Sequence, residues 1–532
     1  MIWTDHIIKD IHARYESLIA KKVPLVIRDE KTISGRVHVG SLRGVAVHGT
    51  IDELLAREEV AHTFLYELND FDVFDSIPEY LDKKSYEPYL GAPLMNVPFL
   101  GEEGRGAKYP EYFGGEFQSV IEENGFHPSY YWASELYRSG KMNEVIRTAL
   151  EQKDLIREIY KEVSGSIKHE SWLPVSVICE QCGKIATTQA ETFDGVRVGY
   201  RCRKDAVSWT HGCGYEGSRS PFDGNAKLLW KVEWAAKFKV LDVHVEGGGK
   251  DHSTKGGARD VANHIAEKVF HHNPPIDIPY EFFLVGGKKM SSSKGRGASA
   301  REVSDMLPPH LLRLAMVGKD INQAFNFVPD GDTIPLLYDL YDELAENYFA
   351  GNDDDRSRIF RLIHAPHQEQ GLVKRFLPRF SQVAFLIQMP HIDFDQEMER
   401  LKGDVLSLED QGEIASRAQY ASTWLTHGAP DKYRFELALN YLPEGVSNLS
   451  DTQKQALGEI ARLVESQTQF DGQELHTALH EVKNNSNLSP KEFFEGVYVS
   501  FLGKNYGPKA GWFLSVLDRD FLIKRLKEAS VA

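Results

Sequence analysis

Two stretches of this chain decide its fold: Ser34-Gly35-Arg36-Val37-His38-Val39-Gly40-Ser41 and Lys288-Lys289-Met290-Ser291-Ser292-Ser293-Lys294-Gly295. The first lies between a short apolar run at residues 23–28 and a stretch of helical periodicity at 42–58. A strand, a glycine turn and a helix in this order are typical of the opening of a nucleotide-binding parallel sheet. Gly35 and Gly40 flank His38 without bulky side chains, so the backbone can approach an adenine and a phosphate. His38 is then a candidate donor to the α-phosphate oxygens.

The second stretch combines lysines with three serine hydroxyls. Ammonium and hydroxyl groups held together are suited to a triphosphate, because phosphoryl and adenylyl transfer depend on preorganised charge. Each stretch alone has a plain alternative: a strand-to-helix turn for the first and a solvated flexible loop for the second. The two together, in this order, favour a nucleotide site.

The bulk composition is that of a globular protein of several domains. The chain has 532 residues, of which 42% are hydrophobic and 26% charged. No apolar run approaches the length of a membrane span, and the N-terminal 22 residues read as an amphipathic helix without the apolar core of a signal peptide. These features predict a cytoplasmic protein without a membrane segment. The net charge of −16 is the wrong sign for indiscriminate nucleic-acid binding, so a nucleic-acid ligand requires local basic surfaces such as Lys83-Lys84 or residues 201–204.

Composition and periodicity predict a split α/β domain followed by helices. Apolar β-rich runs at 23–28, 62–68, 240–245 and 280–285 are candidate strands of a Rossmann-type, doubly wound parallel sheet. Residues 130–165 have helical periodicity. The predicted domains are the first half of the sheet at 1–80, a connective insertion at 81–220, the second half at 221–300, linker or stem-contact helices at 301–365, and an all-α C-terminal domain at 366–532.

All four cysteines fall within the predicted insertion. Cys179 and Cys182 are separated by two residues, and Cys202 and Cys213 follow farther along. Thiolates at the first spacing can reach one ion across a tight turn, as in a zinc ribbon. The second pair is less regular, so His211 is an alternative to Cys213 as the fourth ligand. We expect a closed, structural Zn²⁺ site; free buried thiols are the alternative.

A third informative segment begins with Gly247-Gly248-Gly249-Lys250-Asp251-His252. It follows a predicted strand and precedes a predicted helix, so its amides and Asp251 are placed to meet a ribose or an amino-acid ammonium group. A flexible turn whose aspartate caps the helix explains the pattern equally well.

The opening stretches resemble the HIGH and KMSKS signatures of class I aminoacyl-tRNA synthetases. Three further segments, KLLWKVEWAAKF (227–238), GGGKDHSTKGG (247–257) and IPYEFFLVGGKKMSSSKG (278–295), resemble those of class I lysyl-tRNA synthetases. The resemblance covers about residues 20–330, and the helical C-terminus more weakly. It implies ATP-dependent formation of lysyl-adenylate and transfer of lysine to tRNA(Lys), with Mg²⁺ accompanying ATP. It also implies that the C-terminal helices grip the anticodon and the insertion touches the acceptor stem. No obligate protein partner is evident from the sequence.

The resemblance also implies roles for individual residues. Catalysis falls to His38, Lys289 and Lys294. The ATP-binding set is Ser34, Gly35, His38, Gly40, Ser41, Gly249, Asp251, Lys289, Met290, Ser291, Ser293 and Lys294. The lysine pocket matches Thr32, Trp230, His252 and Tyr280. Aromatic walls suit an ammonium group and a lysine stem, although Trp230 and Trp234 are also spaced as a helical core pair.

The sequence departs from the family pattern in three places. Ser292 replaces the second lysine of KMSKS, Ser41 replaces the last histidine of HIGH, and Ile33 precedes Ser34 where proline is usual. Glu30 stands close to Thr32 and is a further candidate contact for the lysine ammonium group. Alternatives are a class I synthetase for glutamate or cysteine, a small-molecule nucleotidyltransferase, and a non-catalytic tRNA-binding paralogue.

Overall fold

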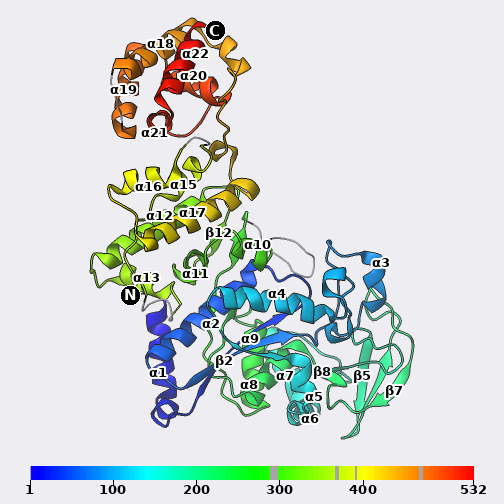
Figure 1. Ribbon diagram of the computed structural model, residues 1–532. Coiled ribbons are helices and arrows are strands. Elements are labelled where there is room, and N and C mark those ends of the chain that lie inside the picture. The colour runs from blue at the N-terminus through cyan, green and yellow to red at the C-terminus, as the bar shows by residue number, and fades with distance from the viewer. Residues whose placement is uncertain (1, 288–297, 366–370, 390–391, 467–470) are drawn as a thin grey trace. The chain divides into compact units, whose positions relative to one another are not determined.

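The structure is a computed structural model that describes residues 2–287, 298–365, 371–389, 392–466 and 471–532 (Figure 1). The chain forms two compact units. Unit 1 comprises residues 1–327 and 350–372, and unit 2 comprises residues 328–349 and 373–532. The boundary therefore differs from the predicted one, because residues 328–349 belong with the C-terminal helices and residues 350–372 with the sheet. No helix of the described residues is both long enough and apolar enough to cross a membrane.

Unit 1 is built on a parallel sheet. Strands β1 (Leu25–Thr32), β2 (His62–Asn69) and β3 (Ser129–Trp132) pair in parallel in the order β1-β2-β3. On the other side of β1 the sheet continues through parallel bridges from Ile27 to Val245 and from Val245 to Ile276. Two parallel pairs follow, β9 (Gly248–Gly249) with β10 (Pro279–Tyr280) and β11 (Phe283–Val285) with β12 (Phe325–Phe327). The predicted parallel α/β sheet is thus present.

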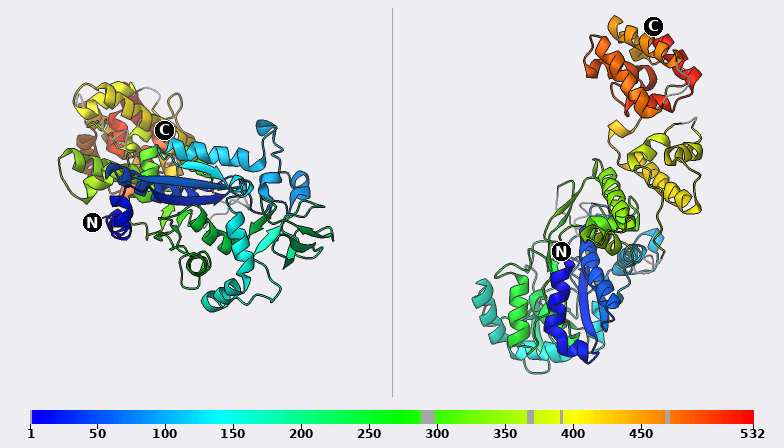
Figure 2. Two further views of the ribbon diagram at one scale, coloured as in Figure 1. Left: turned by 90° about the horizontal axis from the view of Figure 1, so that it is seen from below. Right: turned by 90° about the vertical axis from the view of Figure 1, so that its left-hand side faces the viewer.

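Helices cover both faces of this sheet (Figure 1). One face carries α2 (Val39–Arg57) and α4 (Tyr109–Glu123), together with α10 (Ala300–Ser304) and α11 (Pro309–Val317). The other face carries α8 (Trp230–Val240) and α9 (Ala258–Lys268). Helix α1 (Thr4–Ala20) lies on the surface of unit 1 (Figure 2), and α13 (Asp355–Leu362) completes the unit. Most of helix α2 is buried, which fixes the turn that precedes it.

The predicted insertion also supplies part of the sheet. Strand β3 lies inside residues 81–220 and pairs with β2, so the helical reading of residues 130–165 is wrong at its start. Tyr130, Tyr131 and Trp132 are aromatic residues, which favour a strand. Before β3 come α3 (Lys83–Tyr86) and short 3₁₀ helices at Glu87–Tyr89, Leu94–Asn96 and Glu102–Gly104. After it come the helices α5 (Ala133–Arg138), α6 (Asn143–Glu151) and α7 (Lys153–Ser164).

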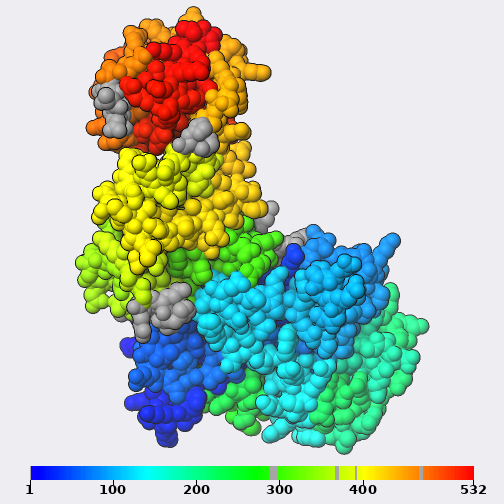
Figure 3. Space-filling model, viewed as in Figure 1, coloured from blue at the N-terminus to red at the C-terminus, as the bar shows by residue number. Residues whose placement is uncertain are grey.

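A small antiparallel lobe then separates α7 from α8. It contains the three-stranded sheet β5 (Thr188–Phe193), β6 (Val198–Cys202) and β7 (Glu216–Arg219), and the pair β4 (Val175–Val177) with β8 (Ala226–Leu228). The lobe and helices α5–α7 share a hydrophobic core with α8 and α9, and the lobe forms one side of unit 1 (Figure 3). Strand β8 leads almost directly into α8, so the lobe ends next to the residues that form the site below.

The described part of unit 2 is helical, as predicted for the C-terminal region. Buried residues between positions 385 and 529 form one hydrophobic core. The helices of the described part are α12 (Thr333–Phe349), α15 (Phe380–Leu386), α16 (Phe394–Lys402), α17 (Leu408–His427), α18 (Asp451–Ser466), α19 (Gly472–Asn485), α20 (Pro490–Leu502), α21 (Ala510–Ser515) and α22 (Arg519–Val531), with 3₁₀ turns at Asp431–Tyr433 and Glu444–Asn448.

Candidate active site

The turn between β1 and α2 carries the first motif and pairs with described residues that follow the second motif in the sequence. His38 is the N-cap of α2, with φ −74° and ψ 151°, and Gly35 has a φ of 145°, a conformation that favours glycine. The chain that returns from the second motif pairs with this turn: His38 bridges to Ser299, and the Ala300 amide donates to the Val37 carbonyl at 2.8 Å. The predicted residues Lys289, Met290, Ser291, Ser293 and Lys294 lie outside the described residues.

Ser299 is the N-cap of helix α10 and fixes where this helix begins. Its hydroxyl accepts from the Glu302 amide at 3.1 Å, while the Glu302 carboxylate accepts from the Ser299 amide at 2.8 Å. This reciprocal capping box starts helix α10 beside His38. Ser299, which follows the second motif in the sequence, is therefore held next to His38 of the first motif. This contact is expected if both motifs contribute to one nucleotide site.

A cavity of about 270 Å³ opens beside His38. It lies at the carboxyl ends of β1 and β9, where parallel α/β sheets bind ligands. Nine of the residues predicted for ATP or lysine line it: Glu30, His38, Gly40, Ser41, Trp230, Gly249, Asp251, His252 and Tyr280. Thr32, Ser34 and Gly35 do not line it. The Thr32 hydroxyl instead donates to Asp72, and the Ser34 carbonyl accepts from Tyr109 at 3.0 Å.

Three aromatic rings form one wall of the cavity. Trp230 and Trp234 are stacked one turn apart on α8, with their ring centres 6.2 Å apart. The His252 ring stands edge-on to both, 5.5 Å from Trp230 and 6.0 Å from Trp234. Trp230 is 48% exposed, so it is not a core residue, whereas Trp234 is 7% exposed. The wall offers aromatic faces to a cation or an aliphatic stem.

The charged lining of the cavity is mainly acidic. Among the described residues, five carboxylates and one lysine line it: Asp29, Glu30, Glu246, Asp251, Glu281 and Lys31. Glu281 forms an ion pair with Lys250, whereas Glu30 and Glu246 belong to a buried cluster described below. An anionic side chain would meet like charges here, and a cationic one would be attracted.

Close packing at Gly44 holds Tyr280 and Asp29 in the cavity wall. A Cβ at Gly44 would lie 2.6 Å from the Tyr280 hydroxyl and 2.8 Å from an Asp29 oxygen. Behind them, His48 Nδ1 donates to the Gly44 carbonyl at 2.7 Å and His48 Nε2 accepts from the Gly247 amide at 2.7 Å. These two contacts hold the His48 ring in place behind the cavity wall. Burial, followed by the nearby Asp29, raises the pKa of Tyr280 well above its usual value.

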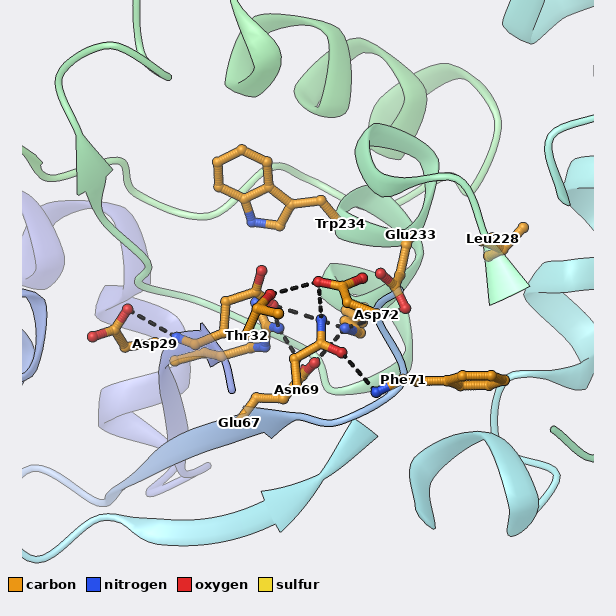
Figure 4. A network of polar contacts seen from close by, with 12 residues as sticks. Asp29, Thr32, Glu67, Asn69, Phe71, Asp72, Leu228, Glu233 and Trp234 are labelled. Carbon is orange, nitrogen blue, oxygen red and sulfur yellow. Dashed lines mark hydrogen bonds and ion pairs between the residues drawn. The ribbon is translucent and has the colours of Figure 1, made fainter. Parts of the chain in front are cut away.

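Arg28 is the centre of a buried ionic cluster beneath the cavity, and Figure 4 shows the part of this cluster around Glu67, Asp72 and Glu233. Its guanidinium donates to Glu246 at 2.8 and 2.9 Å, to Glu67 at 2.7 Å and to Glu30, and its Nε donates to the Tyr131 hydroxyl at 2.8 Å. Glu30 and Glu67 are direct partners in the β1–β2 register. Two adjacent carboxylates would repel each other, so the Arg28 charge is what makes this register tolerable.

Two buried lysines extend the cluster away from the cavity. Lys237 of α8 contacts Glu67 and lies 3.4 Å from Glu233 and 3.8 Å from Glu30. Lys227 contacts Glu233 and lies 3.0 Å from Asp72. Thr32 joins this end of the cluster because its hydroxyl donates to Asp72 (Figure 4), and it is not among the residues that line the cavity.

The cluster separates the pKa values of its two neighbouring glutamates. Burial raises the pKa of Glu30 to about 7, against the opposing effect of Arg28 and Lys237. Burial also acts upward on Glu67, but Lys237 and Arg28 outweigh it and lower the pKa of Glu67 to about 2. Glu67 is fully buried and accepts hydrogen bonds from Arg28, Tyr131 and Lys237. In contrast, 27% of the Glu30 side chain is exposed, and Glu30 lines the cavity. Glu30 is therefore the carboxylate of this pair that can respond to a ligand.

The four cysteines converge in the antiparallel lobe. Their sulfur atoms all lie within 4.8 Å of one another, and the Cys179–Cys213 and Cys182–Cys202 separations are 3.6 Å. Four thiolates around one zinc ion at ~2.3 Å would be about 3.8 Å apart, so the arrangement fits a tetrahedral ion. Gly183, with a φ of 72°, directly follows Cys182, and its amide donates to the Cys179 carbonyl at 2.9 Å, which closes the turn that carries the first two cysteines. The group contains Cys213 and not His211, whose Nδ1 instead contacts the Lys204 carbonyl at 3.0 Å.

Several residues of the site were not predicted from the sequence. Asp29 and Glu246 line the cavity, and Arg28, Glu67 and Lys237 form the cluster beneath it. The alternating charges of Arg28-Asp29-Glu30-Lys31 inside a buried strand were a usable signal, because charged residues are almost never fully buried without partners.

Comparison with known proteins identifies related sequences along the whole chain. Residues 1–369 match the family model described as tRNA synthetases class I (K), and residues 428–530 match the model described as an anticodon binding domain. A lysine–tRNA ligase of Methanosarcina barkeri is 31% identical over 545 residues, covering 99% of this chain and 97% of the relative. A lysine–tRNA ligase of Pyrococcus horikoshii is 31% identical over 544 residues, covering 99% of each.

Proposed function

The chain belongs to the class I tRNA synthetase family, and we propose that it is a lysine–tRNA ligase. The observation that carries the choice of amino acid is the acidic, aromatic-walled cavity beside His38. Lysine brings two ammonium groups and an aliphatic stem, which match its carboxylates and indole rings. Glutamate, the alternative amino acid, would place a third carboxylate beside Glu30 and Glu246 and would be repelled.

The proposed reaction has two displacements. In the first, a carboxylate oxygen of lysine attacks the α-phosphorus of ATP, the bond to the β-phosphate oxygen breaks, and pyrophosphate leaves with the electron pair. In the second, the 2′-hydroxyl of the terminal adenosine of tRNA attacks the carbonyl carbon, AMP leaves, and the hydroxyl proton passes to solvent or to the leaving phosphate. Both steps depend on orientation and charge neutralisation and need no protein nucleophile.

Roles for individual residues follow from position and chemistry. His38, at the N-terminus of α2, is the proposed donor to the α-phosphate, where the helix dipole also favours negative charge. Lys289 and Lys294 are proposed to neutralise the triphosphate, with Lys294 compensating for Ser292, and Mg²⁺ arrives with ATP. Gly40, Ser41, Gly249 and Asp251 are the proposed nucleotide contacts within the cavity wall. Trp230, His252, Tyr280 and Glu30 are the proposed lysine contacts.

Unit 2 supplies the proposed tRNA contact at the anticodon end. Its match to an anticodon-binding model supports this role. A cavity of about 480 Å³ within unit 2 offers a site for an unstacked base, since it is lined by Phe385, Tyr433, Phe435 and Trp512 with Arg379, Lys432 and Lys509 around it. Aromatic faces flanked by cations bind single-stranded nucleic acid through stacking and phosphate contacts.

The four cysteines are proposed to hold a structural Zn²⁺ that orders the antiparallel lobe. With four protein ligands the ion would have no open position for chemistry. Elemental analysis of protein purified without chelators should give one zinc per chain, and Cys182→Ser should lower this stoichiometry and the thermal stability of the lobe. A zinc-free, fully stable wild-type protein would contradict the assignment.

Amino-acid-dependent ATP–pyrophosphate exchange tests the proposed function. The assay should be run with the full chain and a panel of lysine, glutamate and norleucine, each with and without tRNA. We expect exchange with lysine and little with the other two. Exchange driven by glutamate would keep the family and overturn the specificity. Binding of ATP and tRNA without exchange for any amino acid would indicate a non-catalytic paralogue.

A further inference from the structure

The ionic cluster beneath the cavity carries more negative than positive charge. Its carboxylates are Glu30, Glu67, Asp72, Glu233 and Glu246, and its cations are Arg28, Lys227 and Lys237, so three positive and five negative charges give −2 when all are ionised. Buried charge without a counter-charge is costly. Asp29 and Lys31 beside Glu30 add one charge of each sign, and Arg259 near Glu246 adds a positive one, so an excess of negative charge remains that a bound cation would offset.

The position of the cluster determines where such a cation can bind. Arg28, Glu67 and Lys237 have side chains that are at most 1% exposed, and Glu233 is 3% exposed. Only Glu30 and Glu246 of the five carboxylates line the cavity. The excess negative charge thus faces the cavity through these two residues, next to the Trp230–Trp234 wall.

Lys237 holds this arrangement from behind. It does not line the cavity, and it reaches Glu67, Glu233 and Glu30 from helix α8, the helix that also carries Trp230 and Trp234. Lys237 therefore links Glu30 on β1 and Glu67 on β2 to α8, the helix that carries the aromatic wall. Removing its charge would leave Glu67 and Glu233 with fewer partners, and the Glu30 oxygen that Arg28 and Lys237 both approach would keep only Arg28.

We propose that Lys237 is a positioning residue for amino-acid selection: through Glu67 and Glu30 it holds the buried carboxylates as a preformed counter-charge for the substrate's ammonium group, without contacting the substrate. The inference rests on the proposed function. It adds that selectivity against neutral amino acids of similar shape comes from a fixed cluster of charges and not from Glu30 alone.

The variant Lys237→Met, with Lys227→Met as its matched control, tests this role in the full chain. Both remove a buried ammonium group from the same cluster, but Lys227 contacts Asp72 and Glu233 and not Glu30. The probe is the dissociation constant of a lysyl-adenylate analogue, measured by calorimetry. We expect Lys237→Met to weaken binding about tenfold, a factor that corresponds to one pKa unit of interaction, and Lys227→Met to have a clearly smaller effect. Equal losses in the two variants would overturn the proposal.

A second variant, Glu67→Gln, should shift the pH dependence of analogue binding in the direction opposite to Lys237→Met. General destabilisation would not produce opposite shifts. Glu30 is faced by Arg28, Asp29 and Lys31 on β1, Glu67 on β2, Lys237 on α8 and Glu246 before β9. Arg28 and Lys237 lower the pKa of Glu30, and Glu67 raises it. In Lys237→Met the loss of analogue binding on acidification should therefore move to higher pH, and in Glu67→Gln to lower pH. The analogue's own titration is common to all variants.

If the pH at which analogue binding is lost moves in the same direction in both variants, or does not move, the proposal is contradicted. Thermal unfolding shows whether Lys237→Met is folded. If it is not, the result for Glu67→Gln decides alone. Failure of the proposed function is distinguishable from failure of this inference. If wild-type protein binds a glutamyl-adenylate analogue as tightly as the lysyl one, the proposed function fails. If wild type is selective and the variants do not differ as described, only the role of Lys237 fails.

Discussion

The cavity beside His38 in unit 1 and the Trp512-lined cavity in unit 2 differ in the chemistry of their linings. The cavity of unit 1 is acidic, and its carboxylates are held from beneath by Arg28 and Lys237. The cavity of unit 2 is aromatic, and two of its three cations are paired with acids: Lys432 with Asp332 at 2.8 Å and Arg379 with Asp339 at 2.7 Å. Buried charge selects strongly by the sign of the ligand's charge, whereas stacking surfaces tolerate many bases. We therefore expect large effects of single substitutions in unit 1 and modest ones in unit 2.

The largest effect is expected from Glu30→Gln. This change removes the carboxylate that faces the cavity and keeps the side-chain volume, and truncating one partner of a desolvated charge pair costs about 2–5 kcal/mol. The KM for lysine should rise on the order of a hundredfold, with the KM for ATP little changed. Glu281→Gln is the matched control, because Glu281 lines the same cavity but is already paired with Lys250. Similar losses in both variants would mean that the cavity's overall charge matters and the position of Glu30 does not.

The pH dependence of lysine use provides the next test. The pKa of Glu30 is raised to about 7, and its ionised form is the one that attracts an ammonium group. Since the lysine side chain stays charged throughout, kcat/KM for lysine should fall as pH decreases through 7, by about tenfold between pH 8 and pH 6. Glu30→Gln should abolish this limb. A limb that persists in the variant would assign it to another group.

Trp230→Ala should weaken lysine use about tenfold in kcat/KM, because it removes a cation–π face and the packing surface for the stem. Trp230→Phe should restore part of the loss. Trp230 is 48% exposed, so the thermal stability should change little. A large loss of stability with unchanged lysine kinetics would return Trp230 to the role of a structural partner of Trp234.

In unit 2, Trp512→Ala should raise the KM for tRNA about fivefold, the lower range for loss of one stacked base. Binding of a lysyl-adenylate analogue should keep the wild-type affinity, because the analogue reaches only the cavity of unit 1. Tyr441→Ala is the control, since Tyr441 is 63% exposed and does not line the cavity. An unchanged KM for tRNA would exclude this cavity as a base-binding site.

Local patterns allowed part of this site to be predicted from the sequence. The glycine turn around His38, the cysteine pair at 179 and 182, and the aromatic residues Trp230 and His252 are each defined by near neighbours in the chain. The structure brings these last two residues together in one cavity wall. It also decides between Cys213 and His211 by geometry that the spacing left open.

The other features of the site could not be predicted, because they depend on strand register and on contacts between elements that are distant in the sequence. The contact of the Thr32 hydroxyl with Asp72, opposite Asn69 at the end of β1, was not predicted, and the predicted contact of Thr32 with lysine stays a prediction. Glu30 and Glu67 become neighbours only because β1 and β2 pair in one register. Strand β3 was assigned to a helix because a short aromatic run has no clear periodicity of its own. A single sequence does not specify these long-range pairings.

A crystal structure of the full chain with a lysyl-adenylate analogue tests the central claim most directly. The account predicts the side-chain ammonium group at the acidic floor of the unit 1 cavity, within about 3 Å of the Glu30 carboxylate, with the stem against Trp230 and His252. An ammonium group turned towards solvent, with Glu30 still held only by Arg28 and Lys237, would contradict it.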